Sequence, residues 1–249
     1  MPRLRPLLAL LLALAVAVTC VRLGLWQVGR WREKNARNER LAIEMAAPPR
    51  PLAAGAAGTR TTAMRAGRVW VEGRFDEEHQ FVLVGRALDG SPGVHLVTPL
   101  LPGDGGPAIL VDRGFVPAPD AATAWPPAFP EPGERRVVGR LEPLARRTGD
   151  PLWREQPNDS IRLWSARWID PDSVAAALPY AVAPALLVEL PGPGVPAAPR
   201  RPPVRPADTS IHLNYAGQWF FFALVALVGP LVLARARRRR RPDAPGGPP

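Results

Sequence analysis

The chain carries little of the side-chain chemistry on which most enzymes depend. Its 249 residues include one cysteine, three histidines, three methionines and a single lysine. The lone Cys20 excludes an intrachain disulfide and a C-x-x-C redox motif. There is also no G-x-S-x-G, H-E-x-x-H or phosphate-binding loop motif. The sequence therefore does not predict an enzyme.

The same scarcity argues against a copper-delivery protein. Such a protein offers clustered cysteine, methionine or histidine ligands, whereas Cys20 stands alone and the methionines lie far from His212 in the sequence. No copper is therefore expected. His79 follows three acidic residues and is predicted to lie in a solvated turn, and His95 is predicted to be a core or edge residue of a strand.

Two arginines leave their role open. Asp112 and Arg113 are neighbours where a strand is predicted to end, and Arg74 follows Gly73 in another predicted strand. In one interpretation such an arginine forms an ion pair that fixes a turn. In the other, its guanidinium binds a carboxylate-bearing ligand.

Two hydrophobic runs lie near the ends of the chain, and each approaches the ~20 residues that cross a bilayer. We therefore predict transmembrane helices at 7–26 and 215–234. The first run is not predicted to be a cleaved signal peptide, because no small-x-small cleavage site follows it. Between them, residues 27–214 form the main domain. Residues 1–6 and 235–249 are the remaining termini.

The net charge of +10 is concentrated in these membrane flanks. Residues 1–40 carry +6 and residues 235–249 carry +5, whereas residues 41–210 carry −1. A nucleic-acid partner is therefore not expected, and the arginine-rich tail should lie against anionic lipid on the cytoplasmic face. Arginines after the first run favour the opposite orientation, but long domains translocate largely regardless of charge.

The chain has 31 arginines beside its single lysine, and no amphipathic transit peptide precedes the first run. These features favour a bacterium over an organelle. We predict a multi-pass protein of the bacterial cell (plasma) membrane with both termini cytoplasmic and the main domain extracytoplasmic.

The main domain is predicted to be β-rich (α+β, antiparallel and barrel-like). Short runs of Val, Leu and Ile are bounded by Gly, Pro and Asp, as is typical of strands. The predicted strands are Arg68–Phe75, Gln80–Arg86, Gly93–Leu100, Ala108–Phe115, Arg136–Leu141 and Ala185–Leu190. A short helix is predicted at Asp170–Leu178, with Asp170 as its N-cap and Pro171 in its first turn.

Three segments are predicted to be irregular. Met45–Thr62 is rich in Ala, Gly and Pro and is expected to be a mobile insertion. Pro117–Gly133 is rich in proline and contains Trp125. Pro191–Pro206 holds seven prolines and is expected to be an extended spacer back to the membrane.

The segment that opens the second hydrophobic run is the most informative. At helical spacing His212, Tyr215 and Trp219 are i, i+3 and i+7, so they share one face. An ionisable group near a span is costly unless it is used, and a neutral imidazole is a common ligand of haem iron. Two interpretations stay open: a haem-binding face, and an interfacial histidine that bonds lipid or backbone.

Five stretches in order carry a resemblance to the Surfeit locus protein one (Shy) family of cytochrome c oxidase assembly proteins. Phe115 stands where the family more usually has tryptophan. The matching stretches are Leu23–Arg30 leading to Lys34, Gly73–Phe75, Gly93–Leu100, Val111–Pro117 and His212–Phe220.

The resemblance implies an integral membrane assembly factor, a chaperone that binds haem a and assists its insertion into the catalytic subunit of cytochrome c oxidase. His212 would be the iron ligand, and Arg30 would pair with a haem propionate. The haem a synthesis machinery is a further expected partner. The alternative is a scaffold that stabilises an oxidase subunit without a cofactor. The expected cofactor-binding residues are His212, Tyr215 and Trp219 on the second helix and Trp26, Gln27 and Arg30 at the opposing helix end.

Overall fold

The computed structural model describes residues 4–52, 67–144, 147–156 and 161–239. The chain divides into two compact units. One is a helix pair formed by the two ends of the chain, up to residue 42 and from residue 206 onward. The other is a β domain formed by residues 43–205.

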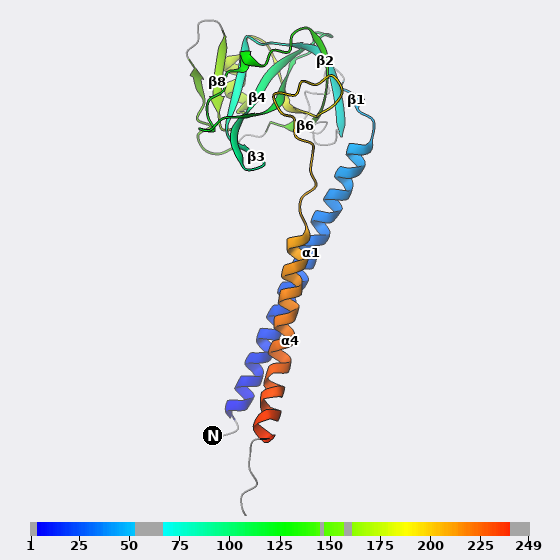
Figure 1. The fold of residues 1–249 in the computed structure, drawn as a ribbon, viewed down its shortest axis with the longest axis vertical. Helices are drawn as coiled ribbons and strands as arrows, with labels where there is room; N and C mark the ends of the chain where they lie inside the picture. The colour runs from blue at the N-terminus through cyan, green and yellow to red at the C-terminus, as the bar shows by residue number, and fades with distance from the viewer. Residues whose placement is uncertain (1–3, 53–66, 145–146, 157–160, 240–249) are drawn as a thin grey trace, which may run out of the picture. The chain divides into compact units, whose positions relative to one another are not determined.

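Two long apolar helices make up the helix pair. Helix α1 spans Leu4–Ala46 and helix α4 spans Ser210–Arg239. Both are long and apolar enough to cross a membrane. The two helices lie side by side (Figure 1) and are joined by a hydrogen bond between their side chains. Many of their leucine, valine and phenylalanine side chains are exposed, which suits a surrounding of lipid rather than water.

The first helix extends well past the predicted span, and this corrects one expectation. Trp26, Gln27 and Arg30 lie in the middle of α1 rather than at a helix end. The helix continues because residues 30–46 contain no proline or glycine. Charged side chains one turn apart also stabilise it, as in the ion pair of Arg37 with Glu33 at 2.7 Å. The bilayer limits at 7–26 and 215–234 stay predictions, since helix length does not fix them.

The β domain is built on a nine-stranded sheet that closes into a barrel (Figure 1). The strand order is β1-β2-β6-β9-β5-β4-β3-β8-β7, and a further pairing of β2 with β4 closes β2, β6, β9, β5 and β4 into a ring. The bounds are β1 Arg50–Pro51, β2 Arg68–Phe75, β3 His79–Leu88, β4 Ser91–Pro102, β5 Ala108–Pro117, β6 Glu134–Pro143, β7 Arg154–Gln156, β8 Arg162–Ala166 and β9 Val182–Glu189.

The predicted fold class is confirmed, with two apolar helices flanking a β-rich domain that contains a closed barrel. All six predicted strands are present, and three short or peripheral strands, β1, β7 and β8, were not predicted. Three pairings, β1–β2, β3–β8 and β5–β9, are parallel, and the rest are antiparallel. The predicted helix is α3, Pro171–Ala177, and its N-cap Asp170 accepts a hydrogen bond from the backbone N of Ser173 at 2.9 Å.

Alternating apolar residues from all five ring strands fill the barrel. In β2 and β9 every second side chain is buried, as the two-residue period of a strand requires. The barrel core comprises Val69, Val71, Phe75, Leu100, Ile109, Val111, Val137, Leu141, Ala183, Ala185 and Leu187. A second cluster packs β3 and β8 against α3 through Phe81, Trp164 and Val174.

Four buried charged side chains form a network beside this core. Arg113, Glu131, Glu189 and Arg201 are each no more than 5% exposed. One carboxylate oxygen of Glu131 accepts from both Arg113, at 2.8 Å, and Arg201. Arg201 also donates to Glu189 at 2.9 Å. Because an unpaired charge in an apolar interior is costly, each of these groups requires the others.

Further contacts of Arg113 tie the network to neighbouring strands. Its guanidinium donates to Gln80 of β3 and to Thr98 of β4, both at 3.3 Å, and lies over the ring of Phe75. Burial, and next the positive charge of Arg201, lower the pKa of Arg113 to about 10, so it stays protonated at neutral pH. Of the two interpretations left open for Arg113, the ion pair is the one observed, but its partner is Glu131 rather than Asp112. Arg74 is exposed.

The proline-rich segment 191–206, predicted to be an extended spacer, forms no helix and is in addition bonded to the β domain. Its Arg200 exchanges two backbone hydrogen bonds with Phe115 of β5, each 2.8 Å long. This close approach requires Gly114, which has a φ of +108° and whose missing Cβ would lie 2.4 Å from the carbonyl oxygen of Arg200. Arg201 follows into the buried network, so the segment is anchored to the β domain.

The other two segments predicted to be irregular differ. Within Pro117–Gly133 only a short 3-10 turn, η2 at Pro126–Ala128, is present, and Trp125 is exposed. Most of Met45–Thr62 lies outside the described residues.

Replacing Glu131 with glutamine should destabilise the β domain by about 3–5 kcal/mol, because two buried guanidinium groups lose their shared carboxylate. The loss is measured as a fall in the urea midpoint of the purified full-length protein. The matched control is Glu155→Gln, which removes an exposed ion pair with Arg162 and should cost at most about 1 kcal/mol. Similar small losses in both variants would show that the domain does not depend on Glu131.

Candidate functional site on the helix pair

The predicted face of the second helix lies near its start. His212, Tyr215 and Trp219 all belong to α4, which begins at Ser210. Tyr215 is 46% exposed, and Trp219 is half-buried and packs edge-on against Phe222. His212, Tyr215 and Trp219 therefore have the helical spacing that places them on one face of α4.

His212 is held by a side chain of the opposite helix. Its Nδ1 lies 2.8 Å from the Oε1 atom of Gln27 on α1. Since an amide oxygen only accepts hydrogen bonds, this contact assigns the proton to Nδ1 and leaves the lone pair on Nε2. The Nε2 atom is buried and has no hydrogen-bond partner among the described residues. A neutral imidazole in this tautomer is the form that ligates metal ions through Nε2.

Two further contacts hold the helices together near this pair. Gly24 of α1 has no side chain, and the ring of Phe220 occupies the space, since a Cβ at Gly24 would lie 2.7 Å from it. Asn38 binds the backbone of Ala207 twice, donating to its carbonyl at 2.8 Å and accepting from its N–H at 3.0 Å. Gln27 lies between Gly24 and Asn38 on α1, so its register opposite His212 is fixed from both sides.

Trp26 and Arg30 contact each other rather than α4. The guanidinium of Arg30 lies 5.9 Å from the ring centre of Trp26 and pairs with Glu33 at 3.0 Å. Of the six residues predicted for the site, the structure brings His212 and Gln27 into contact. No hydrogen bond or ring contact joins Tyr215 or Trp219 to α1 in the part of the chain that the structure describes.

Sequence reasoning missed Glu33 and Asn38 as neighbours of this site. Glu33 follows Arg30 by three residues and precedes Arg37 by four, so the helical spacing of opposite charges was a readable signal once the helix was extended past Trp26. Asn38 carried no such signal, because its partner Ala207 is 169 residues away in the sequence.

The two histidines of the β domain are both engaged with aspartates. His79 is not in a solvated turn: its side chain is 16% exposed, pairs with Asp76 at 2.8 Å and stacks on Trp164. Asp76 also accepts from the hydroxyl of Tyr180 at 2.5 Å, and burial together with this bond raises the pKa of Tyr180. The turn is therefore packed against the second core cluster. His95 lies in β4, as expected, and pairs with Asp112 at 2.8 Å.

A closed β barrel between two apolar terminal helices defines a membrane-anchored barrel protein, with the imidazole of His212 on its helix pair. Comparison with known proteins gives the family. The SURF1 family model matches residues 14–224, and the chain therefore belongs to the SURF1 family.

Similar proteins occur in bacteria and eukaryotes. A SURF1-like protein of Mycobacterium tuberculosis is 30% identical over 232 residues, which cover 90% of this chain and 81% of the relative. Cytochrome oxidase assembly protein SHY1 of Saccharomyces cerevisiae is 26% identical over 157 residues, 61% of this chain and 40% of the relative. Surfeit locus protein 1 of Mus musculus is 32% identical over 118 residues, 42% of this chain and 38% of the relative.

The tautomer of His212 is directly measurable. In protein labelled with 15N at histidine, the resonances that disappear in His212→Ala should identify an Nδ1-protonated ring. Gln27→Met should remove this preference, because a thioether is only a weak acceptor. Gln218→Met makes the same change on the exposed surface of α4 and should leave the tautomer as it is. An Nε2-protonated His212 in the wild-type protein would rule out the assignment.

Proposed function

We propose that this protein is a membrane-anchored assembly factor for cytochrome c oxidase that binds haem a on its helix pair and assists insertion of haem a into the catalytic subunit. The name of the yeast relative, cytochrome oxidase assembly protein SHY1, supports the assembly role. The observation that carries the haem proposal is the state of His212: its Nδ1 is held by Gln27, and its buried Nε2 has no hydrogen-bond partner in the described parts of the chain. The role is binding and transfer, without turnover.

The residues present fit a haem better than a bare metal ion. A single imidazole is a poor site for an ion alone, whereas haem brings four nitrogen ligands of its own and takes an axial imidazole from the protein. The hydrogen bond from Nδ1–H to Gln27 would fix the ring and increase the basicity of Nε2. Tyr215 and Trp219 supply aromatic surface on the helix face of His212. Because Nε2 is shielded, loading would require neighbouring side chains to move.

Arg30 is the proposed partner of a haem propionate. In the structure it pairs with Glu33, but both side chains are about half exposed. An exposed ion pair is worth less than about 1 kcal/mol, so Arg30 can exchange Glu33 for another carboxylate at little cost. Trp26 lies beneath the guanidinium and would contribute to the same site.

The bond between His212 and Gln27 also supports a second function. The same contact joins α1 to α4 without any cofactor, so a scaffold that stabilises an oxidase subunit would need nothing further. The two proposed functions differ in whether the purified protein contains haem.

Haem occupancy of His212→Ala distinguishes them. Full-length protein purified in detergent from a host that makes haem a should show haem a in a reduced-minus-oxidised absorbance spectrum. His212→Ala should lose most of this haem, and Arg30→Gln should lose a smaller part, at most about fivefold in affinity. Asn214→Ala, an exposed change two residues from His212 on α4, is the control and should keep it.

If His212→Ala retained the wild-type occupancy and spectrum, ligation by His212 would be wrong. Haem-free wild-type protein that still co-purifies with an oxidase subunit would favour the scaffold.

We also propose that both termini are cytoplasmic and that the β domain lies outside the membrane, with the arginine-rich tail against anionic lipid. A fluorescent protein fused after Pro249 should fluoresce, because it folds in the cytoplasm. Alkaline phosphatase fused there should be inactive. The reverse pattern would overturn this topology.

A further inference from the structure

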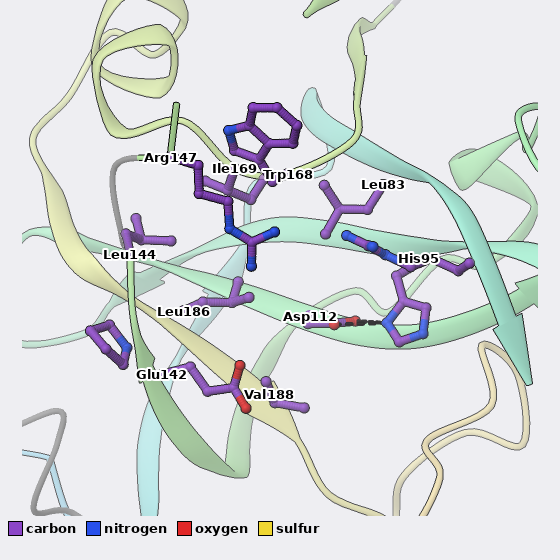
Figure 2. Close-up of a pocket in the computed structure, with 12 residues that line it drawn as sticks. Leu83, His95, Asp112, Glu142, Leu144, Arg147, Trp168, Ile169, Leu186 and Val188 are labelled. Carbon is purple, nitrogen blue, oxygen red and sulfur yellow. Dashed lines mark hydrogen bonds and ion pairs between the residues drawn. The ribbon is translucent and has the colours of Figure 1, made fainter. Parts of the chain in front are cut away.

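The β domain contains a cavity that the proposed function does not use. Its volume is about 220 Å³, and it lies over one face of the neighbouring strands β6, β9, β5, β4 and β3. Five leucine, isoleucine and valine side chains line part of its wall, and Trp168 adds an aromatic surface (Figure 2). The remaining lining is largely ionisable, so the cavity offers an apolar surface beside polar groups that could orient a small molecule.

Two positively charged groups face this cavity. Arg147 projects its guanidinium into it (Figure 2). Burial lowers the pKa of Arg86 most, the negative charge of Asp112 acts in the opposite direction, and the positive charge of Arg147 adds to the lowering. Arg86 donates to the carbonyl oxygen of Arg167 at 2.8 Å. Arg147 has no ion pair with any residue that the structure describes.

The two acids at the cavity are each held by other partners. Asp112 accepts from His95 at 2.8 Å, seen as the dashed contact in Figure 2, and from the backbone N of Gly114 at 2.9 Å. Glu142 pairs with Arg140 at 2.5 Å. Arg147 is therefore the guanidinium at the cavity that has no ion pair among the described residues, and a carboxylate bound between it and Arg86 would offset the repulsion between the two.

We propose that this cavity binds a small monocarboxylate with an apolar body, its carboxylate held between Arg86 and Arg147. A planar carboxylate suits bidentate pairing with guanidinium. A phosphate dianion suits the cavity less well, because the fixed negative charges of Asp112 and Glu142 would repel the second charge. The apolar wall beside Trp168 takes the body of the ligand. The volume limits that body to roughly the size of a single ring, since cavities for drug-sized ligands begin at about 300 Å³.

Benzoate and its neutral isostere benzamide test this proposal on the full-length protein in detergent. Ligand-observed NMR should show saturable benzoate binding, with a Kd on the order of 1 mM as expected for so few atoms, and at least tenfold weaker binding of benzamide. Arg147→Gln and Arg86→Gln should each weaken benzoate binding about tenfold or more. Arg147 is exposed, so its replacement leaves the fold intact even if Arg86→Gln does not fold.

Arg162→Gln is the matched control, because it removes an exposed arginine of β8 that pairs with Glu155 and does not line the cavity. It should bind benzoate like the wild type. Equal binding of benzoate and benzamide, equal losses in Arg147→Gln and Arg162→Gln, binding of inorganic phosphate as tight as that of benzoate, or no saturation by benzoate would each overturn the proposal. The test uses no haem, so its outcome is independent of the proposed function.

Discussion

The β domain depends on the buried charge of Glu131. Its carboxylate is shared by Arg113 of a central barrel strand and by Arg201 of the segment that leads to the second helix. A charge removed from water is tolerated only when its partners are in place. Closure of the barrel and attachment of the proline-rich segment therefore stabilise each other, because Glu131 pairs with both arginines only when both are in place. The seven prolines of that segment limit its alternatives, and Arg201 selects the path it follows.

This network explains part of the family resemblance in physical terms. The stretch Gly93–Leu100 supplies Thr98, and the stretch Val111–Pro117 supplies Arg113 together with the glycine against which Arg200 packs. Asp112, the neighbour of Arg113, points to His95 instead. Adjacent residues on a strand face opposite sides, so one arginine enters the buried network while the aspartate faces the cavity. These motif positions serve the fold of the β domain, and the helix motifs around Gln27 and His212 are left as the candidates for function.

Local sequence patterns predicted much of the secondary structure, but they could not predict contacts between residues that are far apart in the sequence. The strands that build the barrel and the N-cap of α3 follow from turn residues and two-residue alternation. Strand β8 was missed because it is only five residues long. Its pairing with β3 also joins segments that are about eighty residues apart in the sequence. No local sequence pattern around Glu131 or Arg201 indicated that the two side chains, 70 residues apart, would form an ion pair. For the candidate site, helical spacing predicted the shared face of His212, but the 185-residue separation from Gln27 concealed the hydrogen bond that sets its tautomer.

The central claim is that His212 offers Nε2 to haem iron while Gln27 holds Nδ1. Resonance Raman spectroscopy tests that bond most directly. Ferrous protein is purified from a host that makes haem a, with and without 15N-labelled histidine. Ligation by His212 should give a low-frequency iron–imidazole stretching band that moves to lower frequency with the label and is absent in His212→Ala. A haem-loaded protein with no isotope-sensitive band, or one whose band survives in His212→Ala, would contradict it.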